Sequence, residues 1–151
     1  MAGKPKHKRF RGFAVAAGSQ VRATKVRVCE QCDVSAQPGT KPKSCEYCGG
    51  LAFMVFDSVG ECGRWHILRM LRGDNQNPVT DLRRQVRFPL YAARTVQGRV
   101  VASRVGFYVA DFVYDRGGET IIEDFKGAIT DLASWKLRHM EAQGMPVKLT
   151  G

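Results

Sequence analysis

GFYVADFVYDRGGETIIEDFKG, residues 106–127, contains the clearest local structural pattern in the sequence. Two runs rich in β-branched and aromatic residues flank the turn-forming sequence DRGG, which predicts an antiparallel hairpin. If Gly117 and Gly118 form a two-residue turn, opposing positions sum to 235, so Asp111 faces Asp124. Opposed side chains on one sheet face have Cβ atoms about 4.5–5.5 Å apart, a distance at which two carboxylates repel. Such a pair favours a bound cation.

Lys126 follows Asp124 by two residues and is therefore expected on the same face of the strand. Two carboxylates and an ammonium group suit hydrated Mg²⁺ and indicate phosphodiester hydrolysis, in which the metal activates a water that the lysine orients. Two alternatives stay open. Asp124 and Lys126 can form an ordinary ion pair on a solvated face, and a three-residue turn would place Asp111 opposite Glu123.

The rest of the chain predicts one α/β (α+β) domain without an internal repeat. We divide it into a basic N-terminal tail (1–19), a β-hairpin that carries a zinc ribbon (20–56) and a core (57–151). The expected elements are strands at 20–28 and 51–56, a helix over 58–71, strands around 83–94 and 98–104, the hairpin described above, a helix from the N-cap Thr130 to Gly144, and a short strand over 147–150.

Four cysteines form two Cys-x-x-Cys pairs, Cys29 with Cys32 and Cys45 with Cys48, separated by a polar loop. This spacing predicts a structural zinc site, because two such turns complete a tetrahedral four-sulfur shell. Two disulfides are disfavoured without a secretion signal, and a redox motif does not explain the second pair. Since sulfur fills every position, we expect this zinc to be structural. Cys62 is expected on a helix face as a small hydrophobic residue.

The positive charge is concentrated near the N-terminus. The chain has 24 Lys and Arg against 14 Asp and Glu, and residues 1–28 hold eight basic side chains and no acidic one. This favours a polyanionic partner, with nucleic acid ahead of a membrane surface or a merely solubilising tail. The expected DNA contacts in the tail are Lys4, Lys6, Lys8, Arg9 and Arg11. No apolar run approaches the roughly 20 residues of a bilayer crossing, and no secretory signal is evident, so we expect a cytoplasmic protein.

Several motifs together resemble the PD-(D/E)XK nuclease superfamily. Asp111 within YVADF, a glycine turn, and EDFKG with Asp124 and Lys126 match its motif, although alanine precedes Asp111 where the motif has proline. The segment FDSVGE (56–61) is similar to the phage and prophage branch whose first helix opens with FDSxxE, a branch that resembles phage-type Holliday-junction resolvases. The resemblance covers roughly residues 51–145, with the zinc ribbon as an insertion. It implies a restriction-endonuclease-like core, in which a central mixed sheet is flanked by helices.

The resemblance also implies roles for individual residues. Asp111, Asp124 and Glu61 would bind Mg²⁺ or Mn²⁺, Lys126 would be the catalytic lysine, and Gln85 an active-site glutamine. Resolvase-type relatives act as homodimers, and a phage protein would work in the cytoplasm of its bacterial host. Alternatives remain for two residues: the pattern Ser-x-x-Glu61 is also a capping box, and a strand glutamine such as Gln85 is often an ordinary surface residue.

We therefore expect a metal-dependent DNA endonuclease that is selective for branched DNA or Holliday junctions. One alternative keeps the fold but cuts ordinary duplex, as a nicking, mismatch or restriction-type nuclease. The other belongs to a different class, a non-catalytic zinc-ribbon nucleic-acid-binding protein. In that case the zinc site and the basic tail would be the functional parts.

Overall fold

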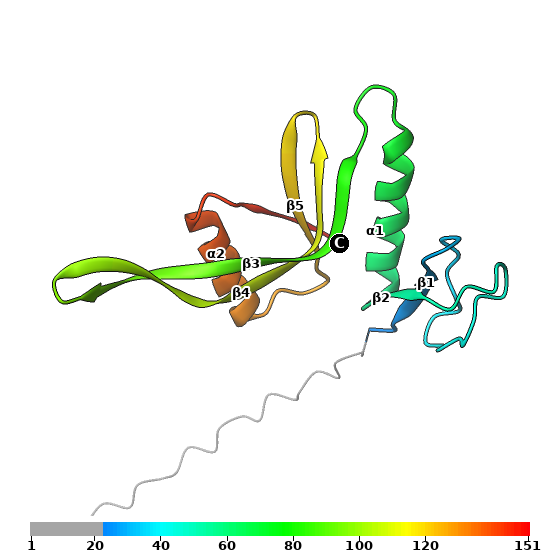
Figure 1. Cartoon of the computed structure of the whole chain (residues 1–151), viewed down its shortest axis with the longest axis horizontal. Coiled ribbons are helices and arrows are strands. Elements are labelled where there is room, and N and C mark those ends of the chain that lie inside the picture. The colour runs from blue at the N-terminus through cyan, green and yellow to red at the C-terminus, as the bar shows by residue number, and fades with distance from the viewer. Residues whose placement is uncertain (1–22) are drawn as a thin grey trace, which may run out of the picture.

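The computed structural model describes residues 23–151, so the predicted basic tail and its five candidate DNA contacts lie outside the described residues. Two short antiparallel strands, β1 (Val26–Cys29) and β2 (Phe53–Phe56), form the first predicted hairpin (Figure 1). The cysteine-containing loop of residues 30–52 connects them. The hairpin therefore places the first cysteine pair at the end of β1 and returns the chain to the core.

Helix α1 (Val59–Met70) follows β2 directly. Ser58 is its N-cap, because its Oγ accepts a hydrogen bond from the backbone amide of Glu61 at 3.0 Å. A short 3-10 helix, η1 (Leu71–Gly73), continues from its last turn. One apolar side of α1 packs on β1, β2 and the central sheet, which forms the first core cluster: Val26, Val28, Phe56, Cys62, Trp65, Leu68, Val79, Phe112 and Tyr114. Cys62 belongs to this core, as predicted.

A four-stranded mixed sheet lies at the centre of the molecule. Its strands are arranged in the order β3 (Thr80–Val96), β4 (Arg99–Arg116), β5 (Glu119–Phe125) and β6 (Val147–Thr150). The first three strands are antiparallel neighbours, and β6 pairs parallel with β5 after a helical connection. The C-terminal strand that the sequence predicts thus closes one edge of the sheet.

The turn between β4 and β5 has two residues, as predicted. Gly117 and Gly118 have φ of 63° and 83°, which glycine adopts without the strain of a side chain and which two-residue hairpins require. Arg116 pairs with Glu119, and the same register continues to Phe112 with Glu123. One further step along this register places Asp111 opposite Asp124. The three-residue turn that would have opposed Asp111 to Glu123 is wrong.

Helix α2 (Asp131–Ala142) covers the opposite side of the sheet from α1. Thr130 caps it by accepting a hydrogen bond from the amide of Ala133 at 3.2 Å, and Gly144, with φ of 77°, follows its end. Its buried Met140 belongs to the second core cluster, which consists of Leu90, Tyr108, Ala110, Val113, Ile122 and Met140. The two helices therefore flank the sheet and stabilise separate parts of it.

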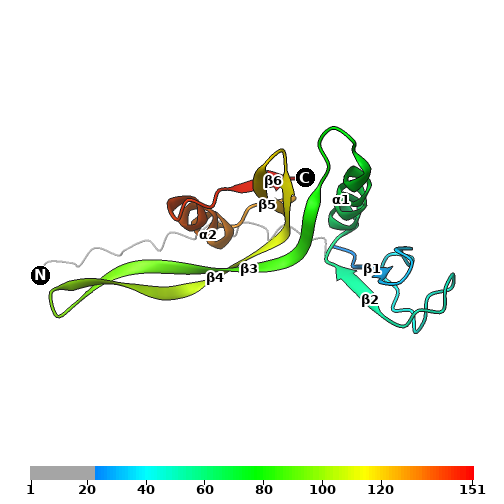
Figure 2. The same cartoon turned by 45° about the horizontal axis from the view of Figure 1, so that its top comes forward.

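The sheet bends between these two clusters. In β3, Leu82 packs against the first cluster and Val86 against the second, although an unbroken strand would point both to one face. Gln85, between them, has φ of 51°, in the left-handed region that few residues other than glycine adopt. β4 makes the same change between Ala110 and Phe112. The bend is visible in Figure 1 and Figure 2. Gln85 on β3 and Asp111 on β4 lie within it.

Beyond the bend, β3 and β4 continue as a two-stranded ribbon that extends past α2 (Figure 2). The sequence predicted separate strands at 98–104 and 106–114, but β4 is continuous. Leu90 pairs with Gly106 and Tyr91 with Arg104, so one extra residue is accommodated as a bulge. The expected break was wrong because a bulge interrupts the pairing pattern without ending the strand.

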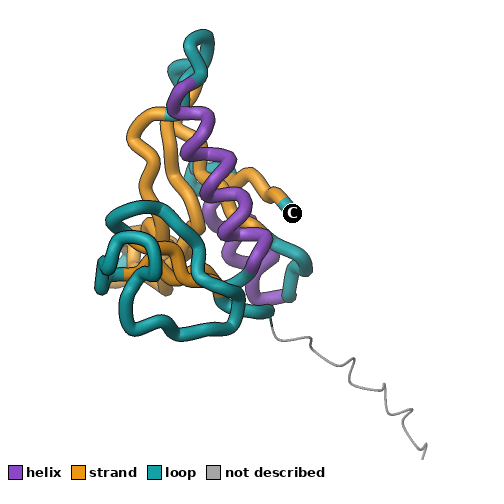
Figure 3. Tube along the Cα trace, turned by 90° about the vertical axis from the view of Figure 1, so that its right-hand side faces the viewer, coloured by secondary structure: helices purple, strands orange, loops and turns teal. Residues whose placement is uncertain are grey.

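The predicted α+β class, with a mixed sheet, two flanking helices and a cysteine-bearing hairpin, is confirmed. Figure 3 shows α1 crossing in front of the strands, with the loop of residues 30–52 beside it. An ion pair between Asp33 and Arg69 joins this loop to α1. Within residues 23–151, no helix has the length and apolarity needed to span a membrane.

Candidate active site and metal centre

Three polar side chains form a row across β3, β4 and β5 at the bend. The amide Nε2 of Gln85 donates to Oδ1 of Asp111 at 3.1 Å. The other carboxylate oxygen of Asp111, Oδ2, accepts the backbone amide of Phe125 at 2.9 Å. The left-handed backbone of Gln85 stores strain, which commonly marks functional positions. Gln85 and Asp111 are therefore fixed relative to each other by both backbone and side chain.

Asp124 is only 1% exposed and lies next to Asp111 on the adjacent strand. Its Oδ2 accepts a hydrogen bond from the Tyr108 hydroxyl at 2.5 Å and lies 3.1 Å from the ammonium Nζ of Lys126. Its Oδ1 is buried and, among the described residues, no donor reaches it. Asp124 and Lys126 therefore form the ion pair of the alternative interpretation, but Asp124 does not lie on a solvated face, because its carboxylate is buried. Its unsatisfied oxygen is free to accept a ligand.

The two carboxylates differ in their pKa values. Burial raises the pKa of Asp111 to about 7, helped by its contact with Asp124 and by the negative charges of Asp124 and Glu61. Burial also opposes ionisation of Asp124, but its contacts with Asp111, Tyr108 and Lys126 together lower its pKa. Below about pH 7 the metal-free pair thus holds one proton, on Asp111. A divalent cation can replace that proton, so the donor set fits Mg²⁺ or Mn²⁺.

Glu61 lies at the start of α1 and is almost fully buried. Its Oε2 accepts the backbone amide of Asp57 at 2.8 Å, and its Oε1 lies 3.5 Å from Nη2 of Arg84. Glu61 therefore caps the helix, as the capping-box alternative predicted. It accepts the backbone amide of Asp57, whereas a capping box uses the amide of Ser58. The charge of Glu61 still contributes to the raised pKa of Asp111. Among the described residues, however, no three carboxylates bring oxygens within 4.8 Å of one another, so Glu61 stands back from the aspartate pair.

Close packing between α1 and β5 sets the position of Glu61. A Cβ on Gly60 would lie 2.4 Å from Cε1 of Phe125, so a larger residue there would have to displace the Phe125 ring. One turn later, Nε and Nη2 of Arg64 donate to the two carboxylate oxygens of Glu123 at 2.5 and 2.8 Å. Glu123 is fully buried and also accepts from Tyr114 at 2.7 Å. The ion pair therefore holds the beginning of α1 against the end of β5.

The four predicted zinc ligands gather at the end of the first hairpin. The sulfurs of Cys29, Cys32, Cys45 and Cys48 all lie within 4.8 Å of one another. Sγ of Cys29 is 3.6 Å from that of Cys48, and Sγ of Cys32 is 3.5 Å from that of Cys45. These separations exceed a disulfide bond of about 2.05 Å and suit a tetrahedral ion with Zn–S distances of about 2.3 Å. The four cysteines come together as predicted, and the cluster could hold a metal such as zinc.

The local backbone fits this cluster. A Cβ on Gly50 would lie 3.0 Å from Sγ of Cys29 and 3.3 Å from Sγ of Cys48, so a side chain there would crowd the sulfurs. Hydrogen bonds from the backbone amides of Cys48 and Tyr47 lower the pKa of Cys45 to about 7. A thiolate is the form that binds metal, so these amides favour zinc binding.

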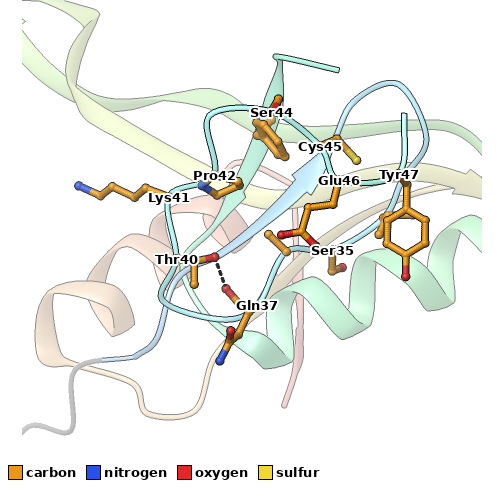
Figure 4. Close-up of a pocket in the computed structure, with 12 residues that line it drawn as sticks. Ser35, Gln37, Thr40, Lys41, Pro42, Ser44, Cys45, Glu46 and Tyr47 are labelled. Carbon is orange, nitrogen blue, oxygen red and sulfur yellow. Dashed lines mark hydrogen bonds between the residues drawn. The ribbon is translucent and has the colours of Figure 1, made fainter. Parts of the chain in front are cut away.

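A cavity of about 440 Å³ lies within the loop that carries the cysteines, rather than at the carboxylates. Figure 4 shows its polar lining, which includes Lys41, Glu46 and Tyr47. The Thr40 hydroxyl donates to the carbonyl of Gln37 at 2.7 Å and fixes one side of it. Its lining includes one basic and one acidic side chain, Lys41 and Glu46. We assign no chemistry to it.

Two residues beside the carboxylates, Tyr108 and Arg84, were not predicted from the sequence. Tyr108 donates to Asp124, and burial together with Asp124 raises the pKa of Tyr108 above its usual range, so the hydroxyl remains a donor. Arg84 lies between Glu61 and the Phe56 ring, 3.7 Å above the ring centre. Nothing in the local pattern distinguishes either residue, because each owes its position to the bend in the sheet.

Comparisons with known proteins identify the family of this domain but not its activity. No curated protein and no solved structure is detectably similar to this chain. A family model described as "Protein of unknown function (DUF1064)" matches residues 50–151, which begin just after Cys48, the last of the four clustered cysteines, and include α1, the whole central sheet and α2. The chain therefore belongs to the DUF1064 family.

Proposed function

We propose that this protein is a Mg²⁺-dependent DNA endonuclease related to the PD-(D/E)XK nucleases. The observation that carries the proposal is the buried Oδ1 of Asp124, which has no donor in the described part of the chain. It lies beside a second carboxylate, Asp111, and within the same group as the ammonium of Lys126. A carboxylate pair with a lysine is a donor set suited to metal-assisted hydrolysis of a phosphate ester.

Asp111 and Asp124 would hold the metal, which when bound supplies a nucleophilic water near neutral pH and neutralises charge on the phosphate. The chain's own residues do the rest. Lys126 is one-third exposed, so its ammonium can reach a phosphate oxygen or a water at the edge of the site while it remains beside Asp124. Tyr108 and Gln85 hold the two carboxylates in place through the hydrogen bonds described above.

Glu61 supports the site from a distance in this proposal. Direct metal binding would require its Oε2 to leave the amide of Asp57, or its Oε1 to leave Arg84. With its present contacts, Glu61 can act on a metal only through an intervening water or through its charge. Its assignment as a direct ligand therefore remains a prediction. Arg84 pairs with Glu61 and offsets its negative charge.

The finer features of the function are proposals as well. Selectivity for branched DNA and homodimer formation come from the resemblance to phage-type resolvases, and a cytoplasmic location comes from the sequence, which shows no secretory signal. The strongly basic segment of residues 1–28, with its eight positive charges, supports a nucleic-acid substrate. The zinc site supports a structural role for the first hairpin, since all four metal positions are filled by sulfur.

The test is cleavage of an end-labelled four-way junction and of its matched linear duplex by zinc-loaded protein in Mg²⁺. We expect the wild type to cut, and the isosteric variant Asp124→Asn to bind DNA without cutting. Lys126→Gln should also lose cleavage. Asp131→Asn serves as the matched control, because Asp131 is an exposed aspartate at the start of α2 and should leave cleavage unchanged.

The substrates distinguish the proposed functions. Paired nicks near the junction alone indicate a resolvase-like enzyme, whereas equal cutting of both substrates indicates a general duplex nuclease. Cleavage by Asp124→Asn at the wild-type rate would refute the assignment of the site. Binding by the wild type without any cutting would favour the non-catalytic zinc-ribbon protein.

A further inference from the structure

We propose that the outer part of the β3–β4 hairpin, residues 91–104, is a DNA-binding ribbon that enters a groove of the duplex. We call this segment the ribbon. The inference rests on the proposed function, because it takes DNA as the substrate and adds the surface that binds it. It follows from the positive charge of the ribbon, from the lack of acidic partners for its arginines among the described residues, and from its shape.

The sequence of this hairpin is basic without any compensating acid. Between Asp81 and Asp111 there are six arginines and no lysine, aspartate or glutamate. Three of the arginines, Arg94, Arg99 and Arg104, lie on the ribbon, and all three are exposed. Arginine binds phosphate oxygens and base edges through two parallel hydrogen bonds, which lysine cannot do.

These arginines have no carboxylate partner in the described part of the chain. The ion pairs there involve other arginines, such as Arg64, Arg84 and Arg116. Residues 1–22, which lie outside the structure, contain no acidic residue that could pair with them. Guanidinium groups without acidic partners on an extended hairpin repel one another, and a bound polyanion would reduce this repulsion.

At the base of the ribbon, two guanidinium groups are held on one aromatic ring. Arg87 lies 4.3 Å and Arg104 4.7 Å from the centre of the Phe107 ring. Such cation–π contacts position a guanidinium group without consuming its hydrogen-bond donors. Both arginines thus keep their donors available for phosphate oxygens, at the point where the ribbon leaves the core.

The shape of the ribbon suits a groove. It is only two strands wide, and its middle carries small side chains at Ala92, Ala93, Ala102 and Ser103. The major groove of B-DNA is about 12 Å wide and admits a two-stranded β-ribbon. Arg104 and Arg99 lie seven and twelve residues from Asp111 along β4. At about 3.3 Å per residue this corresponds to roughly 23 and 40 Å along the strand, which is on the scale of one helical turn of DNA, about 34–36 Å.

A second copy of this chain is the other conceivable partner. The ribbon exposes some apolar surface, including Val100, which is 75% exposed. Two ribbons packed together would, however, bring unpaired arginines of like charge into one interface with no acidic side chain to offset them. Charge complementarity therefore favours nucleic acid, and self-association becomes an outcome of the test.

The test compares two triple variants that each remove three positive charges. The ribbon variant is Arg94→Ala, Arg99→Ala and Arg104→Ala, and the control is Arg72→Ala, Arg138→Ala and Lys148→Ala, three exposed residues away from the ribbon. Binding of a fluorescent 30-base-pair duplex by zinc-loaded protein, without Mg²⁺, is measured by anisotropy across a salt series. A third variant replaces the three ribbon arginines with lysine, and thermal unfolding confirms that each variant is folded.

We expect the ribbon variant to flatten the slope of log affinity against log salt by about 2–3 units, since each lost phosphate contact removes roughly 0.9. The control should change the slope by less than about 1 unit, and the lysine variant should keep most of the wild-type slope. Equal slopes for the ribbon variant and the control would overturn the inference. So would a wild-type dimer that the ribbon substitutions convert to a monomer in sedimentation velocity.

Cleavage in Mg²⁺ is scored separately from binding, so the two proposals fail in different ways. A wild type that binds through the ribbon but never cuts would contradict only the proposed nuclease function. A wild type that cuts, combined with a ribbon variant that binds with an unchanged salt slope, would contradict only the ribbon.

Discussion

Two glycines in α1 provide a matched test of how the helix is held against β5. At Gly60 an added Cβ would lie 2.4 Å from Cε1 and 2.5 Å from Cζ of Phe125, whereas at Gly63 no atom lies within 4 Å. Gly60→Ala and Gly63→Ala therefore introduce the same methyl group on the same helix, into contact in one case and into open space in the other. Phe125 directly follows Asp124, so its displacement would also disturb the candidate site.

The expected magnitudes follow from opposing effects. Replacing glycine by alanine within a helix stabilises the folded protein by up to about 1 kcal/mol. Gly63→Ala should gain this amount, which raises the Tm of a chain of this length by roughly 2–4 °C. At Gly60 the gain is opposed by the cost of overpacking against Phe125, about 1–3 kcal/mol. The free energy of unfolding of Gly60→Ala should therefore lie between the wild-type value and about 2 kcal/mol below it.

The assay is urea unfolding followed by tryptophan fluorescence, since Trp65 is buried in the first core cluster. Adding Phe125→Leu to Gly60→Ala removes the ring and should recover part of the lost stability. If Gly60→Ala stabilises the protein as much as Gly63→Ala does, the close approach of α1 to β5 is refuted.

Four further outcomes are expected. Arg64→Met should destabilise the fold by about 3–5 kcal/mol, because it leaves a fully buried Glu123 without its cation, and adding Glu123→Gln should restore part of this in urea unfolding. Cys45→Ser should lower the zinc content from about one ion per chain and unfold the loop of residues 30–52, which hydrogen exchange would detect as a local loss of protection. Full loss of the metal without a structural change would contradict the structural role of the zinc. Metal-free protein should lose thermal stability as the pH rises from about 4 to 7, because folding raises the pKa of Asp111 and the folded state binds its proton more tightly. Asp111→Asn should remove this pH dependence of the Tm. An unchanged plot of Tm against pH in Asp111→Asn would refute the link between Asp111 and stability. Deleting residues 1–12 removes five positive charges and should weaken DNA binding for all sequences with a shallower salt slope, whereas an identical slope would exclude the tail from the interface.

The hairpin with the paired aspartates was predictable because the alternation and turn rules are local. Two glycines at the turn fixed the register, and the register placed Asp111 opposite Asp124. The cysteine spacing was equally informative, since a four-sulfur metal site requires two closely spaced pairs. Helix α1 and its cap at Ser58 also followed from local patterns.

Features that depend on distant contacts were not predictable. The bend at Gln85 follows from a left-handed backbone that no turn residue announces. It determines which side chains reach the carboxylates, so Tyr108 and Arg84 were missed. Glu61 illustrates the same difficulty, because a capping glutamate and a metal ligand occupy the same position in sequence. The continuity of β4 through its bulge likewise depends on pairing with β3.

Binding of Mn²⁺ by the zinc-loaded protein tests most directly whether Asp111 and Asp124 form a metal site. Titration followed by electron paramagnetic resonance should detect one Mn²⁺ ion per chain in the wild type and in Asp131→Asn. Asp124→Asn should lose this ion, because it removes the charge of the buried carboxylate whose Oδ1 has no donor among the described residues. Unchanged Mn²⁺ affinity in Asp124→Asn, or no bound Mn²⁺ in the wild type, would contradict the proposed site.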